Sequence, residues 1–290
     1  MNIRNGVAVF VAFAALLAGA GVAAFGGGPG AVRKQVEASM LVTGRIDVDS
    51  SGAVSRFSLD RQEKLPAGVV NLVAKAVPTW KFEPVVIDGK PTNVTTRMNI
   101  RLVARKLDAD NYSIELRSAG FGSPSDKWAD RPRGQKLTPP DYPGNAVASG
   151  VGGTVYLLVR AGRDGKVTDA IAEQVNLRVV ASENVMEQWR RVFEDASVRQ
   201  AKRWTFSPPT EGEDADADHL VMRVPVVFSL DDHPASRAYG RWEAYVPGPR
   251  KSNPWREDEE GIGFSPDTLA PGGAYLTGSG LRLLTALSGT

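Results

Sequence analysis

The side chains that most often do chemistry in proteins are scarce in this sequence and form no known motif. Cysteine is absent, and the only histidines are His219 and His233. Disulfides, thiolate metal ligands and a cysteine nucleophile are therefore excluded. The sequence holds no Gly-x-Ser-x-Gly elbow, phosphate loop or dinucleotide fingerprint. We expect no catalytic residue, no cofactor and no enzymatic activity, although the sequence does not show which distant carboxylates the fold brings together.

One acidic loop could hold a cation. It contains Glu211, Asp214, Asp216 and Asp218, directly before His219. Carboxylate oxygens suit Ca²⁺, but the spacing is not that of an EF-hand loop. We therefore predict a solvated loop without a metal site, followed by a solvent-facing histidine at a strand start. Calcium or another metal bound by these residues is the alternative.

The sequence does indicate one possible binding surface, the exposed backbone edge of a strand. The run 220–230 alternates like a strand but contains Pro225. Proline has no N–H to give to a ladder, so within sheets it is confined mainly to edges and bulges. An open edge can accept an extended peptide as an additional strand. We predict a partner-binding edge formed by Leu220, Met222, Val224, Pro225, Val226 and Phe228. The alternative is that the tail or the first copy of the domain covers this edge.

This run closes a unit that occurs twice. In the first copy, a strand at 42–48, which alternates apolar and polar residues, and a strand at 54–59 flank a turn with Gly52. A helix beginning at Pro66 leads to the corner Trp80-Lys81-Phe82-Glu83-Pro84 and the strand 94–104, and its apolar face holds Val69, Val73, Ala76, Val77 and Trp80. In the second, strands at 155–159 and 167–175 flank Gly165, and a helix over 184–203 leads to Trp204-Thr205-Phe206-Ser207-Pro208 and the strand 220–230. The predicted apolar stripe of this helix is Val185, Trp189, Phe193, Ala196, Val198 and Ala201. The shared order predicts an internal duplication. Each copy is expected to be a small α+β domain with a three-stranded antiparallel sheet and a helix on one face.

Five regions follow from this order. Residues 1–30 form a signal peptide or membrane anchor, because Arg4 precedes the uncharged stretch Val7–Phe25. A degenerate copy spans 31–117, a Gly- and Pro-rich linker 118–137, and the second copy 138–231. Residues 232–290, the tail, are expected to pack irregularly on the domains, with a short helix or strand at 281–287. The net charge of +2 offers no basic field for nucleic acid.

The second copy also carries an ordered series of short motifs over residues 138–230. They are Tyr142-Pro143, Ala146, Gly150 and Gly153, then Asp164-Gly165-Lys166-Val167, Trp204-x-Phe206-x-Pro208 and Val224-Pro225-Val226-Val227-Phe228. This series resembles the C-terminal domain of the TonB family. The resemblance implies a periplasmic protein whose edge strand pairs with a segment of an outer-membrane TonB-dependent receptor. It also places Tyr142 and Pro143 near the receptor-contacting surface, although a Tyr142 ring packed on the sheet is our leading interpretation.

Coupling to a proton-driven inner-membrane motor is not expected. The family's membrane anchor uses polar residues such as His or Ser, and Val7–Phe25 contains neither. A duplicated domain also stands where the family has a long Pro-rich spacer. The predicted function is therefore receptor binding by edge-strand addition in support of transport across the outer membrane. The alternative is a periplasmic structural or scaffold protein that uses the same fold without energy transduction.

Overall fold

The computed structural model describes residues 37–106, 112–123, 133–211, 214–230, 239–255 and 261–287. The predicted signal or anchor at 1–30, His233 and residues 124–132 of the predicted linker lie outside these ranges. Within them, no helix has the length and apolar character needed to cross a bilayer. The described chain is mixed α+β, with several antiparallel sheets and few helices.

The first copy forms a five-stranded sheet. Its strands run in the order β12, β1, β5, β6, and β2 lies beside β1 on the same side as β12. The elements of this copy are β1 (Glu37–Val48), β2 (Val54–Leu59), η1 (Gln62–Lys64), α2 (Ala67–Ala76), η2 (Val77–Thr79), β3 (Val86–Ile87), β4 (Lys90–Pro91), β5 (Val94–Lys106) and β6 (Tyr112–Phe121). The tail supplies β12 (Glu243–Tyr245). The predicted three strands are present, and two further strands widen the sheet.

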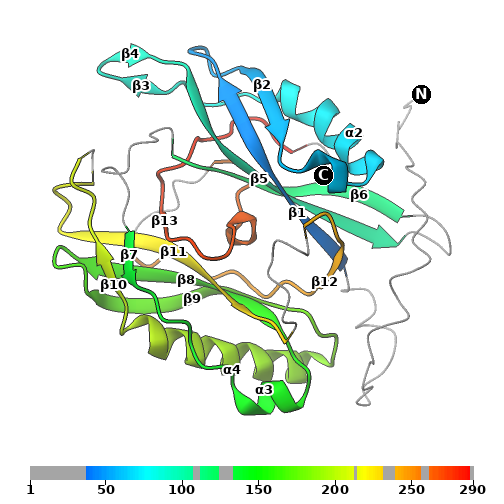
Figure 1. The fold of residues 1–290 in the computed structure, drawn as a ribbon, viewed down its shortest axis with the longest axis vertical. Coiled ribbons are helices and arrows are strands. Elements are labelled where there is room, and N and C mark those ends of the chain that lie inside the picture. The colour runs from blue at the N-terminus through cyan, green and yellow to red at the C-terminus, as the bar shows by residue number, and fades with distance from the viewer. Residues whose placement is uncertain are drawn as a thin grey trace.

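One face of this sheet is covered by α2, which Figure 1 shows on the outer side of the molecule. Val69, Val73 and Trp80 from the predicted helical face are buried in the core. The alternating residues of β1 and β5, such as Ile46 and Ile100, meet them from the sheet. The helix and the strands form here because their apolar periods, 3.6 and 2, point to one shared core.

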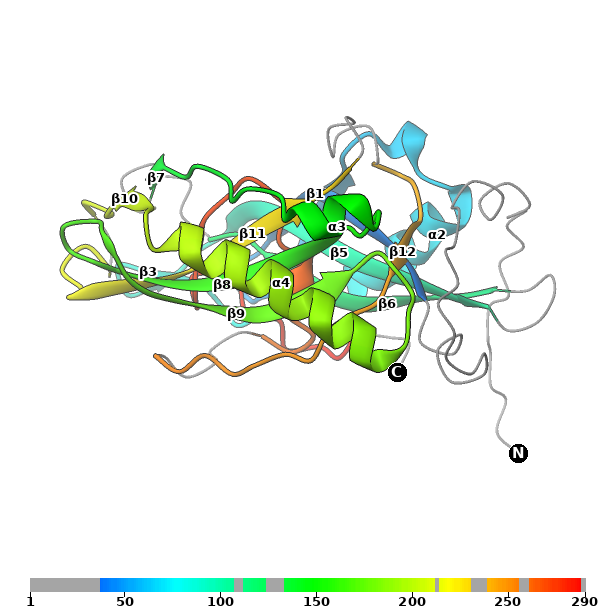
Figure 2. The same ribbon diagram turned by 90° about the horizontal axis from the view of Figure 1, so that it is seen from below.

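The second copy repeats the arrangement with four strands in the order β13, β11, β8, β9. Figure 2 shows α4 lying across one face of this sheet. The elements are β7 (Arg133–Lys136), α3 (Gly144–Ala148), β8 (Gly153–Gly162), β9 (Val167–Leu177), α4 (Glu183–Ala201), β10 (Thr205–Ser207) and β11 (His219–Phe228), joined from the tail by β13 (Tyr275–Leu276). The predicted helix at 184–203 is present, but its buried side differs from the predicted stripe. Met186 and Arg190 are buried, whereas Val185 and Trp189 are only partly buried.

The two predicted copies also share individual hydrogen bonds. The N–H of Phe82 donates to the carbonyl of Gly52 over 2.8 Å, and that of Phe206 donates to Gly165 over the same distance. Both glycines have positive φ, 82° and 76°. A Cβ at Gly165 would lie 1.9 Å from the carbonyl oxygen of Phe206, and one at Gly52 would lie 2.1 Å from that of Phe82. Each turn therefore needs glycine for conformation and for space.

Two predicted boundaries are wrong. The strand β6 continues to Phe121, past the predicted domain end at 117, and β7 pairs residues 133–136 of the predicted linker with β10. Strand pairing with distant partners decides both, and sequence composition does not report it. Residues 281–287 form neither a helix nor a strand, and only the single bridge Phe82–Leu283 involves them.

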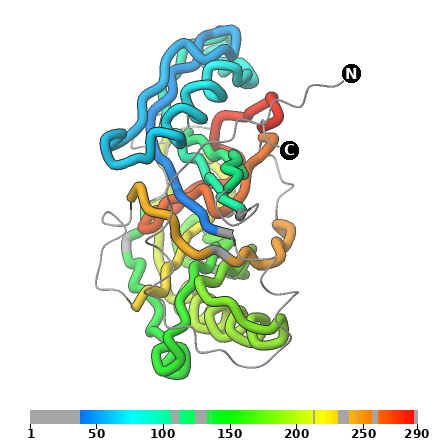
Figure 3. Tube along the Cα trace, turned by 90° about the vertical axis from the view of Figure 1, so that its right-hand side faces the viewer, coloured from blue at the N-terminus to red at the C-terminus, as the bar shows by residue number. Residues whose placement is uncertain are grey.

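The tail lies between the two sheets, where Figures 1 and 3 show its orange and red segments. Leu281 and Leu283 belong to the core of the first copy, while Val246 belongs to the core of the second. The short helix η4 (Pro266–Thr268) contacts β5 and β6. There the Arg101 Nε donates to the carbonyl of Asp267 over 3.1 Å. The tail thus packs across both copies.

Candidate partner-binding edge

The strand β11 is an outer strand for much of its length. It pairs with β8 from His219↔Gly162 to Phe228↔Gly153 without a register shift. On its other side it pairs with β13 only at Met222 and Arg223. Within the described ranges, no strand pairs with residues 224–228 on that side.

The directions of the backbone groups follow from one hydrogen bond. The N–H of Thr277 donates to the carbonyl of Val221 over 3.0 Å, so the backbone groups of Val221 point away from β8. Alternate residues of a regular antiparallel strand point their N–H and C=O to the same side. Pro225 and Val227 therefore also face outward. The missing N–H of Pro225 lies on the outer side of the strand, where it interrupts no bond to β8.

The side chains of the predicted edge are buried. Leu220, Met222, Val224, Val226 and Phe228 all belong to the core beneath α4. Pro225 is buried as well. An added strand could therefore pair with the outer backbone groups of β11, but the strand presents none of these side chains on the surface. Exposure rises toward the strand's end, where Val227 is half-buried and Leu230 is 46% exposed.

Tyr142 lies against the end of this strand. Its ring meets Phe228 and Phe193 edge-on, with centroids 5.4 and 6.1 Å apart, and its hydroxyl donates to the carbonyl of Val151 over 2.8 Å. Burial raises the pKa of Tyr142. Pro143 precedes α3 and is half-buried. The fold thus brings Tyr142 together with Phe228, and the packing of the tyrosine ring on the sheet agrees with our leading interpretation.

A buried ionic cluster joins the opposite face of this sheet to the tail. Glu173 of β9 is 0% exposed, and its carboxylate accepts hydrogen bonds from the Nε of Arg223 over 2.7 Å and the Nε of Arg250 over 2.8 Å. The ring of Phe264 lies 4.8 Å from the Arg223 guanidinium carbon. Sequence reasoning missed this cluster. Its only signal was Arg223 inside the otherwise apolar run 220–228.

The tail also covers part of the free edge of β9. Val246 and Leu177 exchange backbone hydrogen bonds of 3.0 Å, and the N–H of Lys251 donates to the carbonyl of Glu173 over 2.8 Å. Nearby, the side-chain amide Nε2 of Gln174 donates to the backbone carbonyl of Gly248 over 3.0 Å. The tail therefore contacts both outer strands of the second sheet, β9 by several bonds and β11 by a short pairing.

The acidic loop was the candidate for a cation site. Within the described ranges, no group of three or more potential ligand side chains could hold a metal ion. Asp216 is paired instead with Arg163, whose Nη2 lies 3.6 Å from its carboxylate. His219 is exposed at the first position of β11, where we predicted it.

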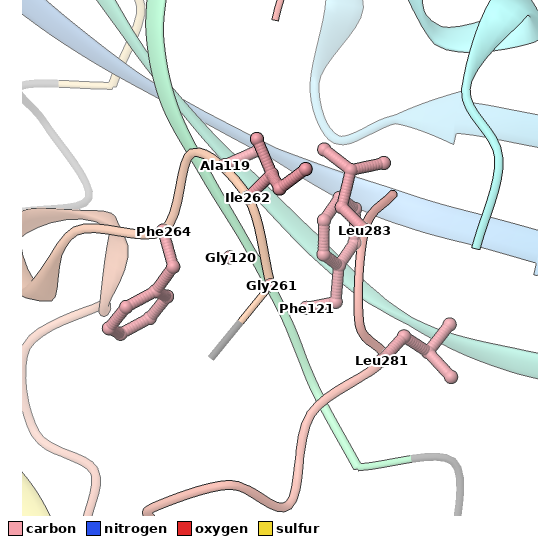
Figure 4. Close-up of a pocket in the computed structure, with 8 residues that line it drawn as sticks. All are labelled: Ala119, Gly120, Phe121, Gly261, Ile262, Phe264, Leu281 and Leu283. Atoms are coloured by element: carbon pink, nitrogen blue, oxygen red, sulfur yellow. The ribbon is translucent and has the colours of Figure 1, made fainter. Parts of the chain in front are cut away.

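A small pocket lies between β6 and the tail, and Figure 4 shows its lining residues, which include Phe121, Ile262 and Leu283. Its volume of about 10 Å³ is at the lower limit for one water molecule. It offers no room for a substrate.

The chain was compared with known proteins at three levels. No protein-family model, curated protein or solved structure matches it.

Proposed function

We propose that this chain is a periplasm-facing, TonB-like protein that binds an outer-membrane TonB-dependent transporter by adding a strand of the transporter to β11. One observation carries the proposal: β11 is paired by the tail only at Met222 and Arg223, so the outward groups of Pro225 and Val227 have no strand partner within the described ranges. Only the motif resemblance points to a TonB-dependent transporter as the partner. The same resemblance underlies the proposal that each copy is a TonB C-terminal-like domain.

Backbone pairing at this edge gives a weak complex. Beyond Arg223, β11 offers the carbonyl of Pro225 and both the N–H and the carbonyl of Val227. At about 0.5–1.5 kcal/mol per hydrogen bond, these groups contribute roughly 2–4 kcal/mol. That energy corresponds at best to a millimolar dissociation constant. Such binding suits a transient contact between proteins that are held near each other.

The alternative is a periplasmic structural or scaffold protein. It is favoured by the tail, which packs between the two sheets and is held on the second sheet by the ion pair of Arg250 with buried Glu173. Leu281 and Leu283 of the same tail belong to the core of the first copy, so the tail links the two copies. Coupling to a proton-driven motor forms no part of either proposal, because residues 7–25 carry no histidine or serine.

Amide NMR on the full chain tests the proposal. We expect a peptide from the periplasmic end of a TonB-dependent receptor, at about 1 mM, to shift the Val227 amide and to slow its exchange with solvent. The Met222 amide, which faces β8, should change far less. Val227→Pro removes the outward N–H and should abolish the shifts of the neighbouring Val226 and Phe228 amides, whereas the matched Val227→Ala keeps that N–H and should retain them. If residues 224–230 do not respond to any receptor peptide, the scaffold alternative stands.

A further inference from the structure

The two copies differ in what lies beside their last strand. In the first copy, β5 is flanked on its outer side by β6, which pairs with it from Met98↔Phe121 to Lys106↔Tyr112. In the second copy, the corresponding strand β11 has only the two-residue β13. The first copy therefore shows, within the same chain, how a full strand completes this edge.

The equivalence of positions follows from the two turn glycines. Val48 stands at the same spacing before Gly52 as Ala161 stands before Gly165. Val48 pairs with Val94 of β5, and Ala161 pairs with Leu220 of β11. Val94 and Leu220 are thus equivalent.

Counting along the two strands from this pair gives the remaining matches. Asn99 corresponds to Pro225, and Arg101 corresponds to Val227. Arg97 corresponds to Arg223. These matches rest on the unbroken registers of β1 with β5 and of β8 with β11.

The two added strands occupy adjacent parts of the edge. In the first copy, the N–H of Gly122, just beyond β6, donates to the carbonyl of Arg97 over 3.0 Å. The strand β13 ends its pairing at Arg223, the position equivalent to Arg97. The part of β11 that corresponds to the β6-paired part of β5 therefore has no strand beside it within the described ranges.

The exposure of one residue shows the difference between the edges of the two copies. Leu230 is 46% exposed, whereas its equivalent in the first copy, Ala104, is 4% exposed and pairs with Ile114 of β6. An added strand that covers 224–230 as β6 covers 98–104 would cover Leu230 as well.

We infer that the partner of β11 is an extended segment that runs antiparallel to it in the register of β6. This inference rests on the proposed function. Residues directly opposite one another share a face of an antiparallel sheet. The partner residues opposite Val224, Val226 and Phe228 are therefore apolar and face α4, as Phe121, Ala119 and Leu116 face the core of the first copy.

The partner residue opposite Pro225 has the place that Gly120 has opposite Asn99. It donates to the carbonyl of Pro225 but receives no hydrogen bond from that residue. The segment that β11 recognises is thus about as long as the stretch 224–230 that it covers. Its apolar side chains stand at alternate positions, on the α4 side. β13 stays in place, because its pairing with β11 ends at Arg223. Ala274, the residue before β13, packs against the same core, and the partner residue opposite Val224 displaces it.

Disulfide trapping tests the orientation and register, since the chain has no cysteine of its own. The probe is a synthetic peptide with the sequence of 112–121 that carries one cysteine at a scanned position, activated as its disulfide with thionitrobenzoate. The protein thiolate attacks the peptide sulfur, and thionitrobenzoate leaves as the thiolate. With Val226→Cys in the full chain, we expect the mixed disulfide to form at least tenfold faster with Ala119→Cys than with Gly120→Cys. A shift by one residue turns the cysteine to the other face. Met222→Cys is the matched control and should give no adduct, because Leu276 already lies opposite it.

A second pair of cysteine positions keeps the test from resting on one variant. Val224→Cys should react preferentially with Phe121→Cys in the same peptide. Equal rates at all peptide positions, or a preference that fits a parallel strand, would overturn the inference while a Val227 amide shift still supported the proposed function. No adduct together with no amide shift from either the β6 peptide or a receptor peptide would overturn both.

Discussion

Replacing Gly165 by alanine tests the structural unit that both copies share. Gly165 has φ of 76°, and a Cβ there would lie 1.9 Å from the carbonyl oxygen of Phe206. Gly150 provides the matched control, because its φ is 66° and nothing lies within 4 Å of a Cβ built on it. The two substitutions thus share the conformational penalty and differ only in the collision.

The two penalties can be separated. Alanine in the left-handed region costs about 1–2 kcal/mol at either site. At Gly165 the collision also separates the turn from the corner and weakens the 2.8 Å hydrogen bond from the N–H of buried Phe206. Losing a buried bond of this kind costs a further 1–3 kcal/mol or so. We expect Gly165→Ala to lower the free energy of unfolding by about 2–5 kcal/mol and Gly150→Ala by about 1–2 kcal/mol.

Urea unfolding followed by tryptophan fluorescence measures both variants. Trp204 belongs to the same corner and reports on its loss. Gly52→Ala should behave like Gly165→Ala, since its Cβ would lie 2.1 Å from the carbonyl oxygen of Phe82. Equal destabilisation by Gly165→Ala and Gly150→Ala would refute the steric reasoning, because only the shared conformational penalty would then remain.

Three further substitutions probe the core and the tail. Trp204→Phe should destabilise the chain by about 1–3 kcal/mol more than Trp80→Phe in urea unfolding, because the indole N–H of Trp204 donates to a carbonyl over 2.8 Å and that of Trp80 has no partner within the described ranges. Glu173→Gln should lower the free energy of unfolding by about 3–5 kcal/mol and speed proteolysis of the tail, because Arg223 then stays buried without its counter-ion. Glu194→Gln, at an exposed ion pair, is the control. Burial raises the pKa of Tyr156 from 10.0 to about 12. The free energy of unfolding should therefore be constant below pH 10 and fall by on the order of 2 kcal/mol toward pH 12, as the unfolded chain loses the tyrosine proton first. A fall of the same size in Tyr156→Phe would contradict this assignment.

Local features could be predicted from the sequence because they depend on neighbouring residues. The alternation in β1 and the helical period from Val69 to Trp80 identified the first core correctly. The glycines of the two turns indicated reversals, and both have positive φ. Pro225 indicated an outer strand, since the lack of an N–H is a property of the residue itself. The buried side of α4 was predicted less well, because Arg190 is stabilised there by Glu183 over 2.9 Å.

The repeated order of strand, turn, strand, helix, corner and strand can be read from the amino-acid sequence, as can the position of the proline in the last strand. Which strand lies beside each copy depends on tertiary packing. β6 completes the first sheet along its edge, whereas β13 covers two residues of the second. Pairing of this kind joins segments far apart in the chain, so it depends on how the whole tail packs between the sheets. For the same reason, only the structure could show that Glu173 meets Arg250.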